Sequence, residues 1–432
     1  MNNFERIGNK LYALAAGKKS SRAHQSLSKA TLVELFFDLV LVFCIRTIGG
    51  VLTDVEGSNI DWYTYYTFCF TFVLLIQIWF NSTVFMNRLG VGGLPDIVFL
   101  FTTMFLLIVM TQAISTSWEH YAIYNICWVL ITVNMAVHWL IRYRHMAHPT
   151  EQMKRDTRMV MVALGIQAIL VLASHALPKN PAQIVCLVAL LSGFSFWNVG
   201  GKDELNEENR EHLTERCALL MVIMFGETLI NFGAKVGTDL DLFRPIMHFL
   251  IIAGMFLIYI NEIANLFDTD SLHGGRLYMA ISAWLTFCVA NLSVGYELAT
   301  DGFSLMGLGG NAFFCLCIAV YLLSFLLFLP FNKYKHPSKK WIVARIIASL
   351  LVFMQTSTVV SAAQSFLTET GFLGVTAETA EIVMMRVMMI VAVIAVYAVV
   401  VIDRIALRRA KAKAALEASE ECEMAESALT EE

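Results

Sequence analysis

Two acidic side chains lie four residues apart in an apolar stretch near the N-terminus, VELFFDLVLVF (33–43). Glu34 and Asp38 share one face of a helix, because residues i and i+4 are one turn apart. A charged carboxylate at membrane depth costs about 2.5–3.5 kcal/mol or more, and two like charges one turn apart repel each other. Either one acid is protonated or a cation lies between them. The spacing therefore indicates a proton or cation site.

A second charged stretch, TERCALLMVIMFGETLI (214–230), has a similar character. Glu215 and Arg216 lie at its start, and Glu227 lies about 18 Å further along a helix. Gly226 would allow a neighbouring helix to approach closely. These charges are either salt bridges that hold a helix bundle together or acids that face a cavity.

We expect Asp38 and Arg216 to pair. Arg46 is about 12 Å from Asp38 along the same helix, which is too far for a direct contact. The carboxylate therefore needs a partner from another helix. Glu34 and Glu215 are alternative partners for the arginine. Glu34 could instead be a helix N-terminal acid beside an N-capping Thr31.

Other polar groups in apolar segments are weaker signals. Glu262 lies in YINEIANLFDTD (259–270) and is a further candidate for coupling or binding. Arg345 and Arg386 lie near the ends of apolar runs, where long side chains reach the polar interface, and His138 is expected to be a hydrogen-bonded packing residue. The tryptophans near segment ends are expected to be interface anchors: Trp62, Trp79, Trp118 and Trp341.

The composition places these residues in a membrane. The chain has 432 residues, of which 57% are hydrophobic and 15% charged, whereas soluble domains carry about 25% charged residues. A membrane helix needs about 20 apolar residues. Twelve segments meet this need: 31–51, 61–82, 94–114, 119–141, 157–177, 181–199, 213–233, 243–266, 276–298, 306–330, 341–366 and 380–403. The predicted fold is an all-α polytopic membrane helix bundle of about 12 transmembrane helices.

The positive charges predict the orientation of this bundle. With the N-terminus inside, the outside loops hold Lys179, Lys235 and Arg244. The spans hold four more, Arg46, Arg216, Arg345 and Arg386, and the other 24 of the 31 Lys and Arg residues lie inside. Because cytoplasmic loops are enriched in Lys and Arg, we expect a multi-pass protein with both termini in the cytoplasm.

Three parts make up the predicted organisation. Residues 1–30 form a basic cytoplasmic arm, 31–404 the helix bundle, and 405–432 a charged cytoplasmic tail. A shift of 181 residues aligns Glu34 with Glu215, which suggests a 6+6 parallel repeat. The sequence has no Walker, HExxH or GxSxG motif, and it indicates no cofactor, metal site or nucleic-acid partner.

The charged motifs resemble those of a known family. VELFFDLVLVF is similar to the ELFFDL signature of the bacterial low temperature requirement protein A (LtrA) family, and ERCALLMVIMFGE (215–227) resembles its second signature. The resemblance implies a bacterial inner-membrane protein. It implies no particular reaction.

Three functions remain open on these residues. The first is a proton- or cation-coupled secondary transporter or permease, with the acids of the first and seventh spans as the coupling site. The second is an intramembrane enzyme or lipid-handling protein that uses Glu34 and Asp38 as acid–base groups. The third is a structural or signalling protein whose charges are packing bridges. The absence of a soluble domain favours the first over an enzyme.

Overall fold

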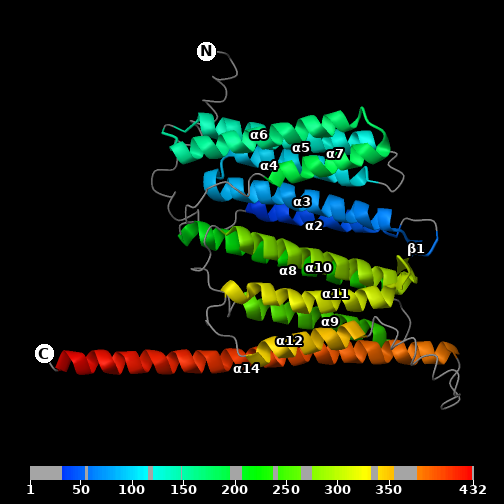
Figure 1. The fold of residues 1–432 in the computed structure, drawn as a ribbon, viewed down its shortest axis with the longest axis vertical. Coiled ribbons are helices and arrows are strands. Elements are labelled where there is room, and N and C mark those ends of the chain that lie inside the picture. Colours follow the sequence, from blue (N-terminus) through cyan, green and yellow to red (C-terminus); the bar gives the residue numbers. More distant parts are fainter. Residues whose placement is uncertain are drawn as a thin grey trace. The chain divides into compact units, whose positions relative to one another are not determined.

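The structure is a computed structural model of the full chain (Figure 1). It describes residues 32–53, 57–114, 120–146, 148–194, 207–236, 242–263, 275–331, 339–354 and 377–430. Thr31, Trp118 and the basic arm at 1–30 lie outside these residues.

The described residues are almost entirely helical. The elements, in chain order, are α2 (Leu32–Gly50), β1 (Asn59–Ile60), α3 (Trp62–Leu89), α4 (Leu94–Gln112), α5 (Tyr121–Arg144), α6 (Glu151–Ser174), α7 (Lys179–Ser192), α8 (Glu207–Ala234), α9 (Phe243–Asn261), α10 (Arg276–Asp301), β2 (Ser304–Leu305), β3 (Leu308–Gly309), α11 (Gly310–Ser324), the 3-10 helix η4 (Phe325–Phe331), α12 (Lys339–Phe353) and α14 (Ala377–Thr430). A high helical content is expected in a membrane, because lipid cannot hydrogen-bond the backbone and a helix satisfies its backbone hydrogen bonds within one segment.

The chain divides into two compact units. Unit 1 lies within Met1–Glu227, Thr269–Ala290 and Phe303–Gly307. Unit 2 lies within Thr228–Asp268, Asn291–Gly302 and Leu308–Glu432. The boundary therefore passes through α8 after Glu227 and through α10 after Ala290.

Unit 1 is organised around α3. Helix α2 packs on α3 and α4, α5 packs on α4 and α6, and α6 packs on α7 (Figure 1). The large side chains Trp79, Trp128 and Trp139 are fully buried, and Phe68 packs against Phe287 of α10. Most residues of α3 are buried inside the protein, so its polar side chains need hydrogen-bond partners within the protein.

Unit 2 is built from α9, α11, α12 and α14. Helix α14 packs on α9 and α12, and α11 packs on α12. A methyl group at Gly254 of α9 would lie 2.5 Å from Cγ1 of Val396. The glycine therefore allows α9 and α14 to approach closely, as small residues do between membrane helices.

Each of the twelve expected segments contains a helix, which confirms the helical class. Among the described residues, nine helices are long and apolar enough to cross a membrane. Three helices fall outside this count. Helix α2 carries three charged residues, Glu34, Asp38 and Arg46, and α7 and α12 are short, at 14 and 15 residues. Length and composition thus support nine spans, and the count of twelve and the 6+6 repeat remain proposals. Many apolar side chains are exposed on α4, α6 and α14, as a lipid environment requires.

Local hydrogen bonds hold the start of α3 and the short strands that lie outside the long helices. Asp61 is the N-cap of α3, and its carboxylate accepts hydrogen bonds from the backbone and hydroxyl of Thr64. These bonds lower the pKa of Asp61, because they stabilise the charged form. Strand β1 pairs in parallel with β2, with Asn59 opposite Ser304. This pairing joins two segments of unit 1 that are far apart in sequence.

Two adjacent glycines at the start of α11 give a test of the packing in unit 2. A methyl group at Gly310 would lie 2.4 Å from the backbone carbon of Leu298, whereas one at Gly309 would meet no atom within 4 Å. We expect Gly310→Ala to lower the free energy of unfolding by about 1–3 kcal/mol, because a backbone cannot move aside easily. Gly309→Ala should change it little. Thermal unfolding of the two purified variants measures this, and equal midpoints would contradict the packing described here.

Candidate functional site

An arginine, two acids and an indole meet where α2, α3 and α8 pack in unit 1. Nη2 of Arg216 donates to Oδ1 of Asp38 at 2.6 Å. Nε1 of Trp79 donates to the same oxygen, also at 2.6 Å. The guanidinium lies over the Trp79 ring, 5.6 Å from its centroid, within the range of a cation–π contact. The predicted pairing of Asp38 with Arg216 is therefore confirmed.

The same cluster continues one turn toward the start of α2. Nη1 of Arg216 donates to Oε1 of Glu34 at 3.3 Å. Nε2 of His212 lies 3.3 Å from the same oxygen. Nδ1 of His212 is 3.2 Å from the side-chain amide of Asn87 on α3. We call Glu34, Asp38, Trp79, His212 and Arg216 the acid–arginine cluster.

The cluster is buried, and two of its acids share one guanidinium. The side chains of Asp38 and Arg216 are 0% exposed, and that of Glu34 is 1% exposed. The carboxylates of Glu34 and Asp38 both face the guanidinium of Arg216. Neither Oδ2 of Asp38 nor Nε of Arg216 has a hydrogen-bond partner within the described residues. Burying ionised groups is costly, and a proton on a carboxylate removes the charge of that group.

Two of the other predicted residues pair elsewhere in unit 1. Nε of Arg46 lies 3.0 Å from Oε1 of Glu227, with side chains 44% and 13% exposed. Glu215 is partly exposed and directly precedes Arg216. The role predicted for Gly226 is wrong, because a methyl group there would meet no atom within 4 Å. The position of a residue along an apolar segment does not show which face of the helix contacts a neighbouring helix.

Glu262 lies in unit 2, where it contacts Arg345. Nη2 of Arg345 donates to Oε2 of Glu262 at 3.1 Å and to Oδ2 of Asp403 at 2.7 Å. The prediction that Arg345 reaches the membrane interface is wrong, since its side chain is 1% exposed. Two buried acids hold it inside the unit. Arg386, by contrast, is exposed and lies 5.3 Å from the ring centre of Phe243.

Two members of the acid–arginine cluster were not found by sequence reasoning. Trp79 was assigned to the membrane interface, but it is fully buried and bonded to Asp38. Trp79 lies three residues before the end of the expected segment 61–82, so its position alone gives no signal for burial. His212 precedes Arg216 by one helical turn, so the two share a face. That spacing, HLTER at 212–216, is the signal for His212.

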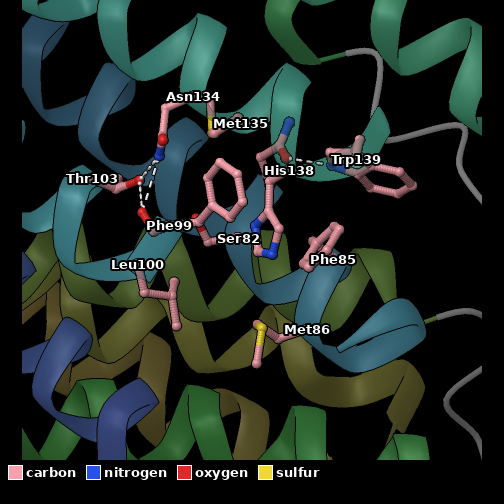
Figure 2. Close-up of a pocket in the computed structure, with 11 residues that line it drawn as sticks. Ser82, Phe85, Met86, Phe99, Leu100, Thr103, Asn134, Met135, His138 and Trp139 are labelled. Carbon is pink, nitrogen blue, oxygen red and sulfur yellow. Dashed lines mark hydrogen bonds between the residues drawn. The ribbon is translucent and has the colours of Figure 1, made fainter. Parts of the chain in front are cut away.

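A second polar group in unit 1 surrounds His138 (Figure 2). Nε2 of His138 lies 2.9 Å from Oδ1 of Asp96, and its ring lies between those of Phe85 and Phe99. The predicted hydrogen-bonded packing role of His138 is confirmed. The adjoining cavity, which Asn134 also lines, measures about 10 Å³. That is about the space of one water molecule, too small for a larger substrate.

Comparison with known proteins agrees with the motifs. The model of the bacterial low temperature requirement A protein (LtrA) family matches residues 29–402, most of the chain. The chain belongs to the LtrA family. Glu34, Asp38 and Arg216 all lie within the part that matches the LtrA model.

One relative of the chain is an uncharacterized protein, RA0937, of Rhizobium meliloti (strain 1021). It is 27% identical over 229 residues, which cover 50% of this chain and 53% of the relative. The match therefore spans about half the length of that relative, whose name assigns no activity. No solved structure matches the chain.

The pairing at Asp38 can be tested by a double-mutant cycle. Arg216→Gln removes the guanidinium that pairs the fully buried Asp38, so it should lower the free energy of unfolding by about 3–5 kcal/mol. Asp38→Asn should cost less, because Arg216 keeps Glu34. The double variant should lose less than the sum of the single losses. Thermal unfolding in one detergent, scored with folded yield, gives the three values.

Arg46→Gln is the matched control for Arg216→Gln. It also removes an arginine that pairs an acid between α2 and α8, but the pair is partly exposed. Exposed pairs contribute about 0–1 kcal/mol, so the loss should be small. Fully additive losses at Asp38 and Arg216, or an equal loss at Arg46, would show that the buried pairing is not what stabilises α2 against α8.

Proposed function

We propose that the protein is a proton-coupled secondary transporter or permease of the bacterial inner membrane, with the acid–arginine cluster as its proton site. Its helices enclose buried ionisable groups, which are rare in membranes and mark ion or proton pathways when they occur. The observation that carries the proposal is the single guanidinium of Arg216 shared by Asp38 and Glu34. We propose further that both termini lie in the cytoplasm, as the loop charges predict.

The arrangement around Asp38 offers a place for a proton. Both hydrogen bonds to this carboxylate, from Arg216 and Trp79, end on Oδ1. Oδ2 has no partner in the described part of the chain. A proton can therefore bind Oδ2 and neutralise the acid without breaking either bond. Protonation weakens the attraction to Arg216, since only the ionised carboxylate forms a charge-assisted pair.

Exposure falls in order along the cluster. The side chain of His212 is 8% exposed, that of Glu34 is 1%, and that of Asp38 is 0%. Histidine is the side chain that most readily changes charge near neutral pH. It lies at the more accessible end, within 3.3 Å of Glu34. We propose that protons enter through His212 and reach Asp38 by way of Glu34.

The helices that supply the cluster give the proton a way to change the structure. Asp38 is on α2, Trp79 on α3 and Arg216 on α8. A ligand shifts a conformational equilibrium only by its differential affinity for the two states. A proton on Asp38 favours a state in which α2 and α8 separate, and its loss favours the paired state. Such a proton-dependent separation of helices is the kind of change that alternating access requires, in which one group of helices moves as a rigid body against another.

A structural role is the second candidate, and one observation favours it. Arg216 contacts both acids directly, and all three side chains are buried, as expected of an ion cluster that only holds helices together. The two functions differ in proton binding. A structural cluster keeps its charge state over the working pH range, whereas a coupling site takes up and releases protons.

Proteoliposomes distinguish these functions. The protein is reconstituted with a pH dye inside and an inside-negative potential, and amino acids, sugars, nucleosides and inorganic cations are added in turn. We expect one solute class to accelerate proton entry at least about tenfold over empty vesicles, which corresponds to about 1.4 kcal/mol in the rate-limiting barrier. Asp38→Asn should abolish this flux, and Arg46→Gln should retain it.

Charge displacement provides an independent measurement when the solute is unknown. A pH jump across a supported layer of these vesicles should give a transient current as protons enter the cluster. His212→Gln should slow this transient and Asp38→Asn should remove it. A folded wild-type protein that gives neither a transient nor a solute-dependent flux would contradict the transporter and support the structural role.

A further inference from the structure

The apolar part of α14 ends in a group of arginines. Helix α14 is long (Figure 1), and its segment from Ile382 to Arg409, 28 residues, is apolar enough to cross a membrane. Such a segment extends for about 42 Å. A bilayer is about 30 Å thick in its hydrocarbon core and about 40–45 Å thick with its headgroups. The last residues of the segment, which include Arg404 and Arg408, therefore lie at the depth of the lipid headgroups.

Contacts within unit 2 fix which face of α14 is buried. Val396 and Asp403 are 0% exposed, and Leu407 is 8% exposed. Oδ2 of Asp403 accepts a hydrogen bond from Arg345 of α12 at 2.7 Å, and Val396 lies close to Gly254 of α9. The three buried residues of α14 are seven and four residues apart, which is the spacing of one helix face. The side chains on the other face therefore point away from the unit.

That outward face carries apolar residues first and arginines after them. Ile394, Val401 and Ile405 are 62%, 54% and 44% exposed. Arg404 and Arg408 are exposed as well. Val401 and Arg408 are seven residues apart, so they lie almost in line along the helix, with Arg404 and Ile405 beside that line. We call these five residues the outer stripe of α14.

The arginines of the outer stripe carry like charges at close spacing. Arg404 and Arg408 are four residues apart, a distance at which like charges destabilise a helix. In the sequence, no acid stands three or four residues from either of them, or from Arg409. The first acid that follows them is Glu417. No acid of α14 at helical pair spacing therefore offsets the repulsion, and an anion from outside the helix can do so.

A phospholipid with an anionic headgroup matches both parts of the outer stripe. Its phosphate can accept two parallel hydrogen bonds from one guanidinium, a geometry that arginine favours. Its acyl chain can lie along the exposed Ile394 and Val401. Clusters of basic residues at the end of a membrane span attract anionic lipids. A free phosphate ion would contact the arginines and leave the apolar residues uncovered, so the stripe favours a lipid over a small anion.

We propose that the outer stripe of α14 binds an anionic phospholipid, with the phosphate on Arg404 and Arg408 and an acyl chain along Ile394 and Val401. Arg409 is also exposed and adds positive charge beside the phosphate. The site belongs to unit 2 alone. Its occupation does not depend on the transport function proposed for the acid–arginine cluster in unit 1.

Lipid binding to the purified full-length protein tests the proposal. Phosphatidylglycerol and phosphatidylcholine with identical acyl chains are titrated separately in a neutral detergent, and native mass spectrometry counts the lipids that each protein retains. We expect the wild type to bind phosphatidylglycerol at least about tenfold more tightly, because two arginines face its phosphate. The double variant Arg404→Gln/Arg408→Gln should reduce this preference to less than about threefold. Equal binding of the two lipids by the wild type would overturn the proposal.

Two further variants separate this site from a general loss of charge. Arg386→Gln is the matched control, because Arg386 is an exposed arginine near the other end of the same segment, over the ring of Phe243. It should keep the preference for phosphatidylglycerol. The variant Arg404→Lys/Arg408→Lys keeps both charges and loses the paired hydrogen bonds, so its preference should lie between those of the wild type and the glutamine variant. A preference that survives in the glutamine variant would place the lipid elsewhere and overturn the assignment.

Competition and oligomeric state distinguish a lipid from other occupants. Inorganic phosphate and glycerol phosphate should not displace phosphatidylglycerol, because neither has an acyl chain. Displacement by either one at the same free concentration would identify a small-anion site. A wild-type dimer in lipid-free detergent that dissociates in Arg404→Gln/Arg408→Gln would assign the outer stripe to a second copy of the chain. Either result would overturn the proposal. All these substitutions are of exposed side chains, so the unfolding midpoint without lipid should stay unchanged.

Discussion

A charged guanidinium held by carboxylates away from water is the interaction on which this structure depends. Arg216 and Arg345 are among the largest fully buried side chains in the described residues. Neither could remain ionised in that position alone, because the cost of removing a charge from water is several kcal/mol per ion. The acids that surround them therefore decide where α2, α8, α9, α12 and α14 can lie within their own units.

These clusters are poor devices for stability alone. A buried ion pair often contributes no more than well-packed apolar side chains of the same volume, whereas removing one partner is severe. In each cluster two acids contact one arginine. The proton binding proposed for the acid–arginine cluster would give its two acids a role beyond stability.

The sequence predicts the helices well and the clusters only in part. Long apolar runs locate the helices because the bilayer sets a minimum length, and the depth of Asp38 together with the loop charges predicts its pairing with Arg216. Trp79 and Asp403 were missed because their roles depend on which faces meet between helices far apart in the chain. Arg345 was misplaced for the same reason, since its position near the end of an apolar run is equally typical of an interfacial residue.

The discontinuous course of unit 1 constrains how the protein is made. Its residues include Thr269–Ala290 and Phe303–Gly307 as well as the N-terminal stretch, and β1 finds its partner β2 only at Ser304–Leu305. Because a ribosome delivers the chain from its N-terminus, α9 of unit 2 emerges before unit 1 has all of its parts. The early helices must wait in the bilayer, with Asp38 unable to meet Arg216 until α8 has been translated. During that interval the carboxylate of Asp38 has no guanidinium from α8 to pair with.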